Sequence, residues 1–155
     1  MLTLTAILHT QNDERLLGRA LESLRPCNEI LVVDHGSTDG TLEIARQFGA
    51  VVLKPSDGPF LEAATGEWVL CLLPTEALSE DLEGGLYEWK QEEPGTTNAY
   101  ALRIREETPA GWRHHAPQTR LVRRGTMHWT GHLPPRMDNA LVFPGDLLRL
   151  ADARP

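Results

Sequence analysis

One stretch, Glu29–Gly49, has the sequence EILVVDHGSTDGTLEIARQFG and indicates a strand, a loop and a helix in succession. Its apolar, β-branched run Ile30–Val33 is typical of a strand buried on both faces of a parallel sheet. Residues 35–40 are turn formers, and residues 41–48 repeat apolar side chains at helical spacing. Asp34 therefore lies at the carboxyl end of a strand, which is where open α/β sheets bind their ligands.

The same alternation of strand and helix extends on both sides of this stretch. Residues 2–8 predict a first buried strand, and Asn12 is a plausible N-cap for the helix that follows it. Residues 50–53 and 68–73 predict a third and a fourth strand. Strands joined by helical crossovers favour an α/β fold with a mixed, mostly parallel sheet flanked by helices.

The second half of the chain has a different pattern. Ser79 is expected to cap one more helix, and residues 99–104, 118–123 and 127–130 are expected to form antiparallel or mixed strands. The tail, residues 143–155, predicts one short amphipathic helix.

Composition excludes some classes of protein. The chain has 155 residues, which predicts a single domain, 1–155, with a substantial core. A formal charge of −7 argues against a general nucleic-acid binder, although arginines gather in the second half, where they predict either a solvated sheet face or a phosphate clamp. Cys27 and Cys71 lack metal-ligand spacing and are expected to be reduced thiols in or near the core.

No targeting or membrane segment is evident. The first residues lack a basic region followed by an apolar stretch, so no secretory signal is predicted. No apolar run approaches the length of a transmembrane helix. These features predict a cytoplasmic protein.

Three segments resemble glycosyltransferase family 2. They are VVDHGSTDGTLEIARQFGA, the preceding TAILHTQNDERLLGRALESL and the following ATGEWVLCL. The resemblance implies a GT-A fold, a Rossmann-like nucleotide-diphospho-sugar transferase fold. It also implies transfer of a sugar from a nucleotide-diphosphate sugar to an unknown acceptor, usually with Mn²⁺ or Mg²⁺. It divides the chain into a nucleotide-binding half, 1–93, and a reduced acceptor-side β half, 94–155.

The resemblance also assigns candidate nucleotide contacts. It implies that Asp34 holds the base or ribose, because a carboxylate accepts hydrogen bonds from imide N–H and hydroxyl groups; the alternative is that Asp34 caps the next turn. His9 and Gln11 stand where the family places nucleotide contacts, and Asp57 follows the third strand. Asp39 is expected to cap the following helix.

The acids that the family uses for catalysis are replaced. Where an Asp-x-Asp metal motif is expected, the chain has Leu73-Pro74-Thr75, and only Glu76 remains as a weak candidate metal ligand or catalytic acid. Where a His-Glu pair is expected, prolines follow His132, which is a weak candidate base. His128 and His132 are four residues apart in a stretch that is not helical, so they do not predict a metal pair.

Three hypotheses remain open at this point. The first is a glycosyltransferase that is metal-independent or that uses Glu76 with Asp34 or Asp57. The second is a non-catalytic relative that binds a nucleotide or glycan or supports an active partner. The third is another nucleotide-using α/β enzyme, such as a nucleotidyltransferase, although no glycine-rich phosphate loop of the usual spacing is present.

Overall fold

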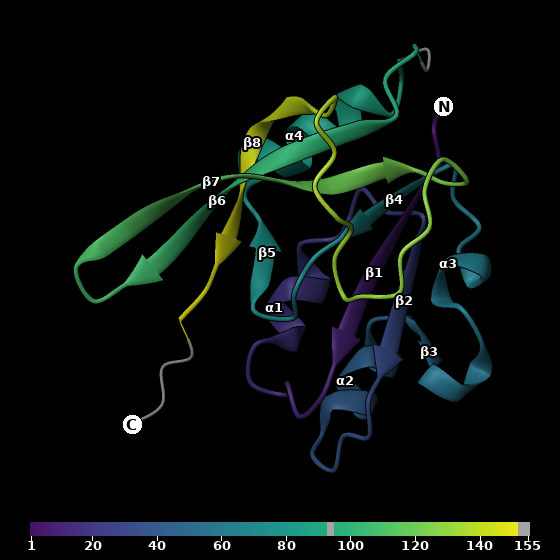
Figure 1. Cartoon of the computed structure of the whole chain (residues 1–155). Helices are drawn as coiled ribbons and strands as arrows, with labels where there is room; N and C mark the ends of the chain where they lie inside the picture. The colour runs from purple at the N-terminus through teal and green to yellow at the C-terminus, as the bar shows by residue number, and fades with distance from the viewer. Residues whose placement is uncertain (93–94, 152–155) are drawn as a thin grey trace.

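The computed structural model describes residues 1–92 and 95–151 (Figure 1). The first half alternates strands and helices, in the order β1 (Leu4–Thr10), α1 (Leu17–Glu22), β2 (Glu29–Asp34), α2 (Thr41–Gln47) and β3 (Val51–Leu53). The middle contains the 3₁₀ turn η1 (Pro55–Asp57), α3 (Phe60–Ala63), β4 (Trp68–Cys71), β5 (Glu76–Leu78) and α4 (Glu80–Trp89). The last elements are β6 (Ala99–Thr108), β7 (Gly111–Arg123) and β8 (Leu141–Arg149).

Within the described residues, eight strands form one mixed sheet in the order β3-β2-β1-β4-β7-β6-β8-β5. Strands β3, β2, β1 and β4 are parallel neighbours, as the alternation of strands and helices predicts. Strand β7 pairs antiparallel with both β4 and β6, and β8 runs parallel to β6. The predicted α/β class with a mixed, mostly parallel sheet is therefore confirmed.

The two faces of β1 face different parts of the molecule, because alternate side chains of a strand point to opposite sides. Leu4, Ala6 and Leu8 pack in the larger core, which contains the buried side chains of α1, α2 and α4. Ile7 packs in a smaller core with Phe60 of α3, and the loop after β7 packs against that second core. His9 is two residues beyond Ile7 and lies on this second face.

Three sequence predictions need correction. Asn12 does not cap α1, which begins at Leu17; Asn12 has φ +55° and bonds instead to the loop after β2. Residues 127–130 form a loop and not a strand. The described part of the tail forms β8 and not a helix, since Leu147 and its neighbours pair with β6 and with β5; residues 152–155 lie outside the described residues.

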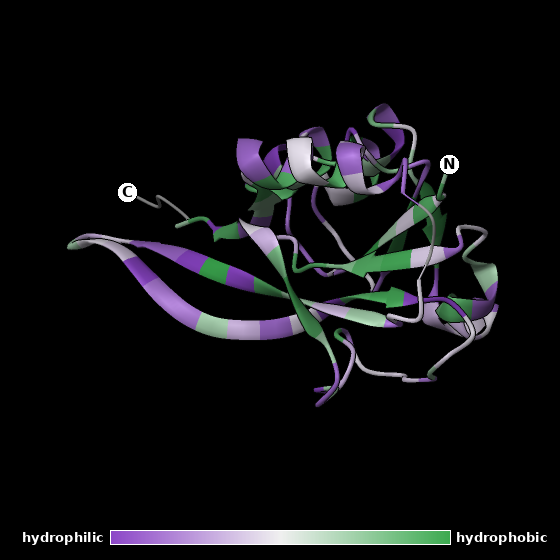
Figure 2. Cartoon of the chain, turned by 90° about the horizontal axis from the view of Figure 1, so that it is seen from above, coloured by the Kyte–Doolittle hydropathy of each residue, from purple (hydrophilic) through white to green (hydrophobic). Residues whose placement is uncertain are grey.

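The β6–β7 hairpin extends beyond the rest of the sheet, and its outer part is mainly hydrophilic (Figures 1 and 2). Trp112 near its end is exposed and lies under the guanidinium group of Arg105, 5.1 Å from the ring centroid. The predicted boundary between the two halves, at residues 93 and 94, lies outside the described residues, and the division into halves stays a prediction. Within the described part, no helix is long and apolar enough to cross a membrane.

Candidate functional site

The carboxyl ends of β1 and β2 lie side by side, with Thr10 opposite Asp34. Several hydrogen bonds join the loops that follow these strands. Asn12 donates its N–H to Ser37 Oγ at 2.9 Å, Thr38 donates its N–H to Asn12 Oδ1 at 2.8 Å, and Gly40 donates its N–H to Glu14 Oε2 at 2.9 Å. These bonds fix the loops 11–16 and 35–40 to each other, and we call this edge of the sheet the platform.

Asp34 organises this platform. Its Oδ1 accepts hydrogen bonds from Thr10 Oγ1 at 2.8 Å and from Ser37 Oγ at 2.6 Å, and its Oδ2 accepts the N–H groups of Gly36 and Ser37. Burial acts to raise the pKa of Asp34, but the bonds from Ser37, Thr10 and Gly36 outweigh burial and lower it. All four bonds come from the chain itself, so the carboxylate fixes the turn after β2, which is the alternative role that the sequence left open.

The other predicted nucleotide contacts lie around this edge. Gln11 is exposed, and its N–H donates to Asp13 Oδ2. Asp57 is exposed at the end of η1, where its carboxylate accepts the Lys54 N–H at 2.7 Å. Asp39 accepts the N–H and hydroxyl of Thr41 at the start of α2, although the N-cap position itself is occupied by Gly40.

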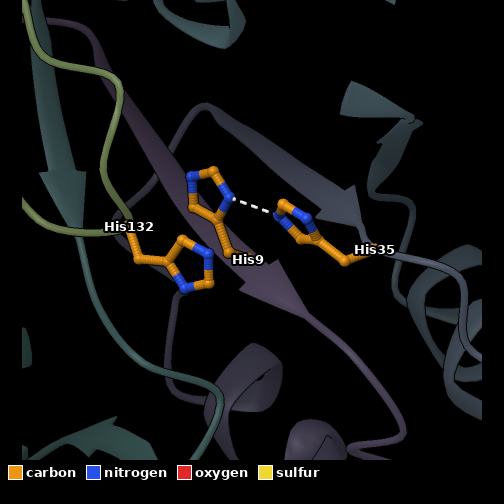
Figure 3. Close-up of side chains that lie close together, drawn as sticks. All are labelled: His9, His35 and His132. Atoms are coloured by element: carbon orange, nitrogen blue, oxygen red, sulfur yellow. Dashed lines mark hydrogen bonds between the residues drawn. The ribbon is translucent and has the colours of Figure 1, made fainter. Parts of the chain in front are cut away.

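Three histidines from separate segments meet beside the platform (Figure 3). His9 belongs to β1, His35 directly follows β2, and His132 comes from the loop after β7. The rings of His9 and His132 are stacked, with centroids 4.3 Å apart and an interplanar angle of 7°. His9 Nδ1 lies 2.9 Å from His35 Nε2, a hydrogen bond in which one ring donates and the other accepts.

His9 is the most buried member of this cluster, with 6% of its surface exposed. Burial, followed by the charges of His132 and His35, lowers the pKa of His9 to about 4. His9 is therefore neutral at neutral pH. Phe60 of α3 lies edge-on to its ring, with centroids 4.6 Å apart, and closes one side of the site.

In the sequence, His9 and His132 are separate candidates, and His35 is only one of several turn residues. A signal for the pair His9–His35 was present, because both residues lie at the carboxyl ends of neighbouring parallel strands. Nothing in the sequence predicts that His132 lies beside His9 and His35. Its position depends on the path of the loop 124–140 after β7, and this loop has no regular periodicity.

A pocket of about 540 Å³ opens next to this cluster. Its walls come from the ends of β1 and β2, from the segment that contains η1 and α3, and from the loop after β7. The lining includes His9, His35, Phe60, His128 and Trp129. The pocket is thus aromatic in character and lies at the ligand-binding edge that the strand order predicts.

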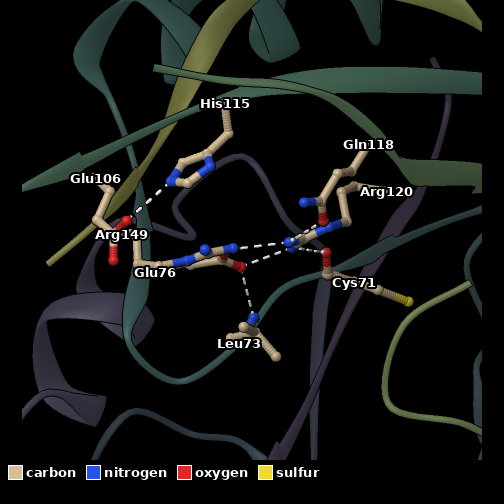
Figure 4. A network of polar contacts seen from close by, with 8 residues as sticks. All are labelled: Cys71, Leu73, Glu76, Glu106, His115, Gln118, Arg120 and Arg149. Carbon is tan, nitrogen blue, oxygen red and sulfur yellow. Dashed lines mark hydrogen bonds and ion pairs between the residues drawn. The ribbon is translucent and has the colours of Figure 1, made fainter. Parts of the chain in front are cut away.

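The position of the missing metal motif, after β4, is occupied by an ion-pair network (Figure 4). Glu76 is fully buried, and its oxygens accept hydrogen bonds from Arg120 Nη1 at 2.6 Å and Nη2 at 3.0 Å. Arg149 Nη2 lies 3.0 Å from Glu76 Oε2, and the Leu73 N–H donates to Oε1 at 2.8 Å. Burial acts to raise the pKa of Glu76, but these contacts, chiefly with Arg120, lower it.

This network does not fit the Mn²⁺ or Mg²⁺ that the family resemblance implies. Both oxygens of Glu76 are bound by guanidinium groups, and Leu73 and Thr75 offer no carboxylate. Two arginines against one glutamate leave a net positive charge, which repels a cation.

Other arginines of the second half also bond to the protein. Arg103 and Arg105 form ion pairs with the two oxygens of Asp146. Arg123 donates to backbone carbonyls of residues 95 and 97, and Arg124 donates to the carbonyl of Gly66 at 2.6 Å. These side chains brace strands and loops, while Arg103 and Arg124 are also exposed to solvent, as the first of the two expectations from the sequence holds.

Comparison with known proteins gives concordant matches. The sequence model of glycosyl transferase family 2 matches residues 5–135. The chain is 35% identical over 91 residues to an uncharacterized glycosyltransferase of Rickettsia typhi, a match that covers 54% of this chain and 31% of that protein. It is 45% identical over 47 residues to the lipopolysaccharide core biosynthesis glycosyltransferase LpsC of Rhizobium meliloti, over 30% of this chain and 17% of that protein.

Solved structures share the fold. TarS of S. aureus superposes with a TM-score of 0.55 and 24% identity over 75% of this chain and 38% of that chain. The mannosyltransferase PcManGT of Pyrobaculum calidifontis, solved with GDP-Man and Mn²⁺, gives a TM-score of 0.53 and 21% identity, over 65% and 35% of the two chains. Each match spans well under half of the relative's own length.

Proposed function

Because the chain belongs to glycosyltransferase family 2, we propose that it binds the nucleotide part of a nucleotide-diphosphate sugar in the pocket beside His9 and His35. The observation that carries this proposal is the position of that pocket, about 540 Å³ in volume, at the carboxyl edge of β1 and β2. A pocket of this size at this edge suits a nucleoside diphosphate.

The side chains that line the pocket suit a nucleotide base. Phe60 and Trp129 supply apolar ring surface, and Trp129 Nε1 is buried without a hydrogen-bond partner. A buried N–H without a partner is costly, and a carbonyl or ribose oxygen in the pocket would satisfy it. Asp34 contributes by holding the turn that carries His35, while Gln11 and Asp57 remain candidate polar contacts on exposed loops.

We propose sugar transfer to an acceptor as the function of the whole protein, by analogy with its family. Glu76 takes no part in metal binding in this proposal, because its two oxygens are held by arginines. His132, which stacks on His9, stays the candidate base for the acceptor hydroxyl.

A second candidate function is a non-catalytic nucleotide- or glycan-binding domain. The ion-pair network after β4 favours it, since the network stands in place of the acids that would bind a metal ion, and it is the metal ion that neutralises a departing diphosphate. Both candidates require the same pocket, and they differ in whether bound donor is consumed. The cytoplasmic location stays a prediction.

Two tryptophan variants test the pocket. Trp129→Ala removes a ring that lines the pocket, and Trp112→Ala removes an exposed ring on the hairpin. Stacking of a base on an aromatic ring contributes about 1–3 kcal/mol, so Trp129→Ala is expected to weaken binding of uridine or guanosine diphosphate about tenfold or more. Trp112→Ala is expected to bind like the wild type.

Isothermal titration calorimetry measures both affinities, and circular dichroism verifies that each variant is folded. Equal affinity of the two folded variants would refute the assignment of the pocket. Incubation with donor sugars then separates the candidates, because release of nucleoside diphosphate marks a transferase and its absence marks a binding domain.

A further inference from the structure

We propose that His9, His35 and His132 form a binding site for one divalent transition-metal ion of the Zn²⁺ type. Each residue offers a ring nitrogen, and these three ligand atoms all lie within 4.8 Å of one another (Figure 3). The site is separate from the position after β4 where the family motif is lost, and it uses no carboxylate. The inference does not depend on nucleotide binding, and it is an alternative to the role of His132 as a base, because a metal-bound imidazole nitrogen has no free lone pair.

An unsatisfied buried atom points to a ligand at this site. His9 Nε2 is buried and has no hydrogen-bond partner, although the other nitrogen of the ring bonds to His35. When His9 Nδ1 carries the proton of that bond, Nε2 is an acceptor without a donor, and binding of an ion requires His35 to leave the bond so that its own lone pair becomes a ligand. A metal ion bound to the ring would remove the cost of this buried atom.

The donor set indicates which metals fit. Three neutral imidazoles suit Zn²⁺, Co²⁺, Ni²⁺ and Cu²⁺, whereas Mg²⁺ and Mn²⁺ prefer carboxylate and other oxygen ligands. Three protein ligands leave a fourth position open in a tetrahedral site. His9 and His35 also line the 540 Å³ pocket, which gives water or a bound ligand access to that position.

The three segments can close on an ion with a small movement. Metal–nitrogen bonds of about 2.0–2.1 Å place tetrahedral ligand nitrogens about 3.3 Å apart. His9 is fixed by burial in β1, whereas His132 is exposed and follows Gly131 in a loop. A shift of His132 by about 1–2 Å, with rotation of its ring out of the stack, brings the third nitrogen into place.

The experiment uses the full chain without a polyhistidine tag, stripped of metal by a chelator. Zn²⁺ is titrated by calorimetry and Co²⁺ by its visible absorption, which becomes intense when the ion is tetrahedral. His35→Ala and His132→Ala each remove one ligand. The matched control is His114→Ala, which removes an exposed histidine on the β6–β7 hairpin.

We expect one equivalent of Zn²⁺ to bind to the wild type and to His114→Ala with the same affinity, and Co²⁺ to give the tetrahedral spectrum. We expect each of His35→Ala and His132→Ala to weaken binding at least tenfold and to lose that spectrum. Absence of saturable Zn²⁺ binding at millimolar concentration would overturn the proposal. So would Zn²⁺ binding that both ligand variants retain at full strength.

Discussion

At the scale of single residues, Glu76 occupies the place where the family resemblance predicts a metal ligand and instead neutralises part of a buried charge cluster. Arg120 is fully buried beside it, and Arg149 is about three-quarters buried. Removing one partner of such a pair leaves the other charge buried without compensation. The residue is therefore a structural requirement of the sheet.

Glu76→Gln is expected to lower the free energy of unfolding by about 3 kcal/mol, because Arg120 then lacks a counter-charge in the interior. Asp138→Asn, which breaks an exposed pair with Arg136, is the matched control and is expected to change stability little. Urea denaturation measures both changes. Equal stability of the two variants would show that the buried pair is unimportant.

The same carboxylate predicts a pH dependence. The pKa of Glu76 is lower in the folded protein than its ordinary value of 4.5, so the folded state favours the ionised form. Its contribution is fully present above pH 4.5 and is lost as the pH falls through the lowered pKa. The stability difference between the wild type and Glu76→Gln should therefore shrink below pH 4.5, as urea melts at several pH values would reveal. A difference that stayed constant down to pH 3 would contradict this assignment.

At this scale the sequence predicts where the parallel strands end and that Asp34 and Asp39 lie in the turn after β2. Such positions can be predicted because the hydrogen bonds of strand ends and turns join residues that are close in the sequence. The sequence did not locate the partners of Glu76. Arg120 and Arg149 are 44 and 73 residues away, and no periodicity of the sequence records such a contact.

At the scale of elements, hydrophobic periodicity predicts the strands and helices of the first half. It does not predict that the tail forms a strand. Leu147 and Leu150 suit an amphipathic helix as well as a strand. The tail forms a strand because β8 pairs with β6 on one side and β5 on the other. This pairing also packs Phe143 against Trp89 of α4. Long-range pairing of this kind overrides local propensity.

Gly145 marks the point where β8 crosses α4. Its φ is +105°, and an added Cβ would lie 2.8 Å from Leu82 Cα and 2.9 Å from Leu82 N. Gly145→Ala is therefore expected to cost about 3 kcal/mol or more in stability, from backbone strain and from the clash together.

Gly125→Ala is the control for that substitution, because Gly125 also has a positive φ, +87°, but open space around it. It is expected to cost about 1 kcal/mol, the strain alone. Thermal denaturation followed by circular dichroism compares the two variants. If Gly145→Ala were no less stable than Gly125→Ala, the close packing of β8 on α4 would be incorrect.

At the scale of the whole molecule, the sheet has the parallel-strand edge at which we propose nucleotide binding, and the Glu76 network stands where the family resemblance implies an acidic metal centre. Strand β4 separates the two features, since it lies between β1 and β7 in the sheet. The pocket is lined by segments on both sides of this edge, and the Glu76 network ties β5, β7 and β8 together. A domain of this design is expected to hold a nucleotide without an acid-bound metal.

Calorimetric titration with uridine and guanosine diphosphate, in EDTA and then in excess Mg²⁺, tests this claim most directly. Mg²⁺ distinguishes the lost acidic centre from the histidine cluster, because it prefers oxygen ligands. We expect saturable binding of at least one of the two nucleotides in EDTA, with no gain in affinity from Mg²⁺. Binding that is absent in EDTA and appears with Mg²⁺ would contradict it, as would no binding of either nucleotide under both conditions.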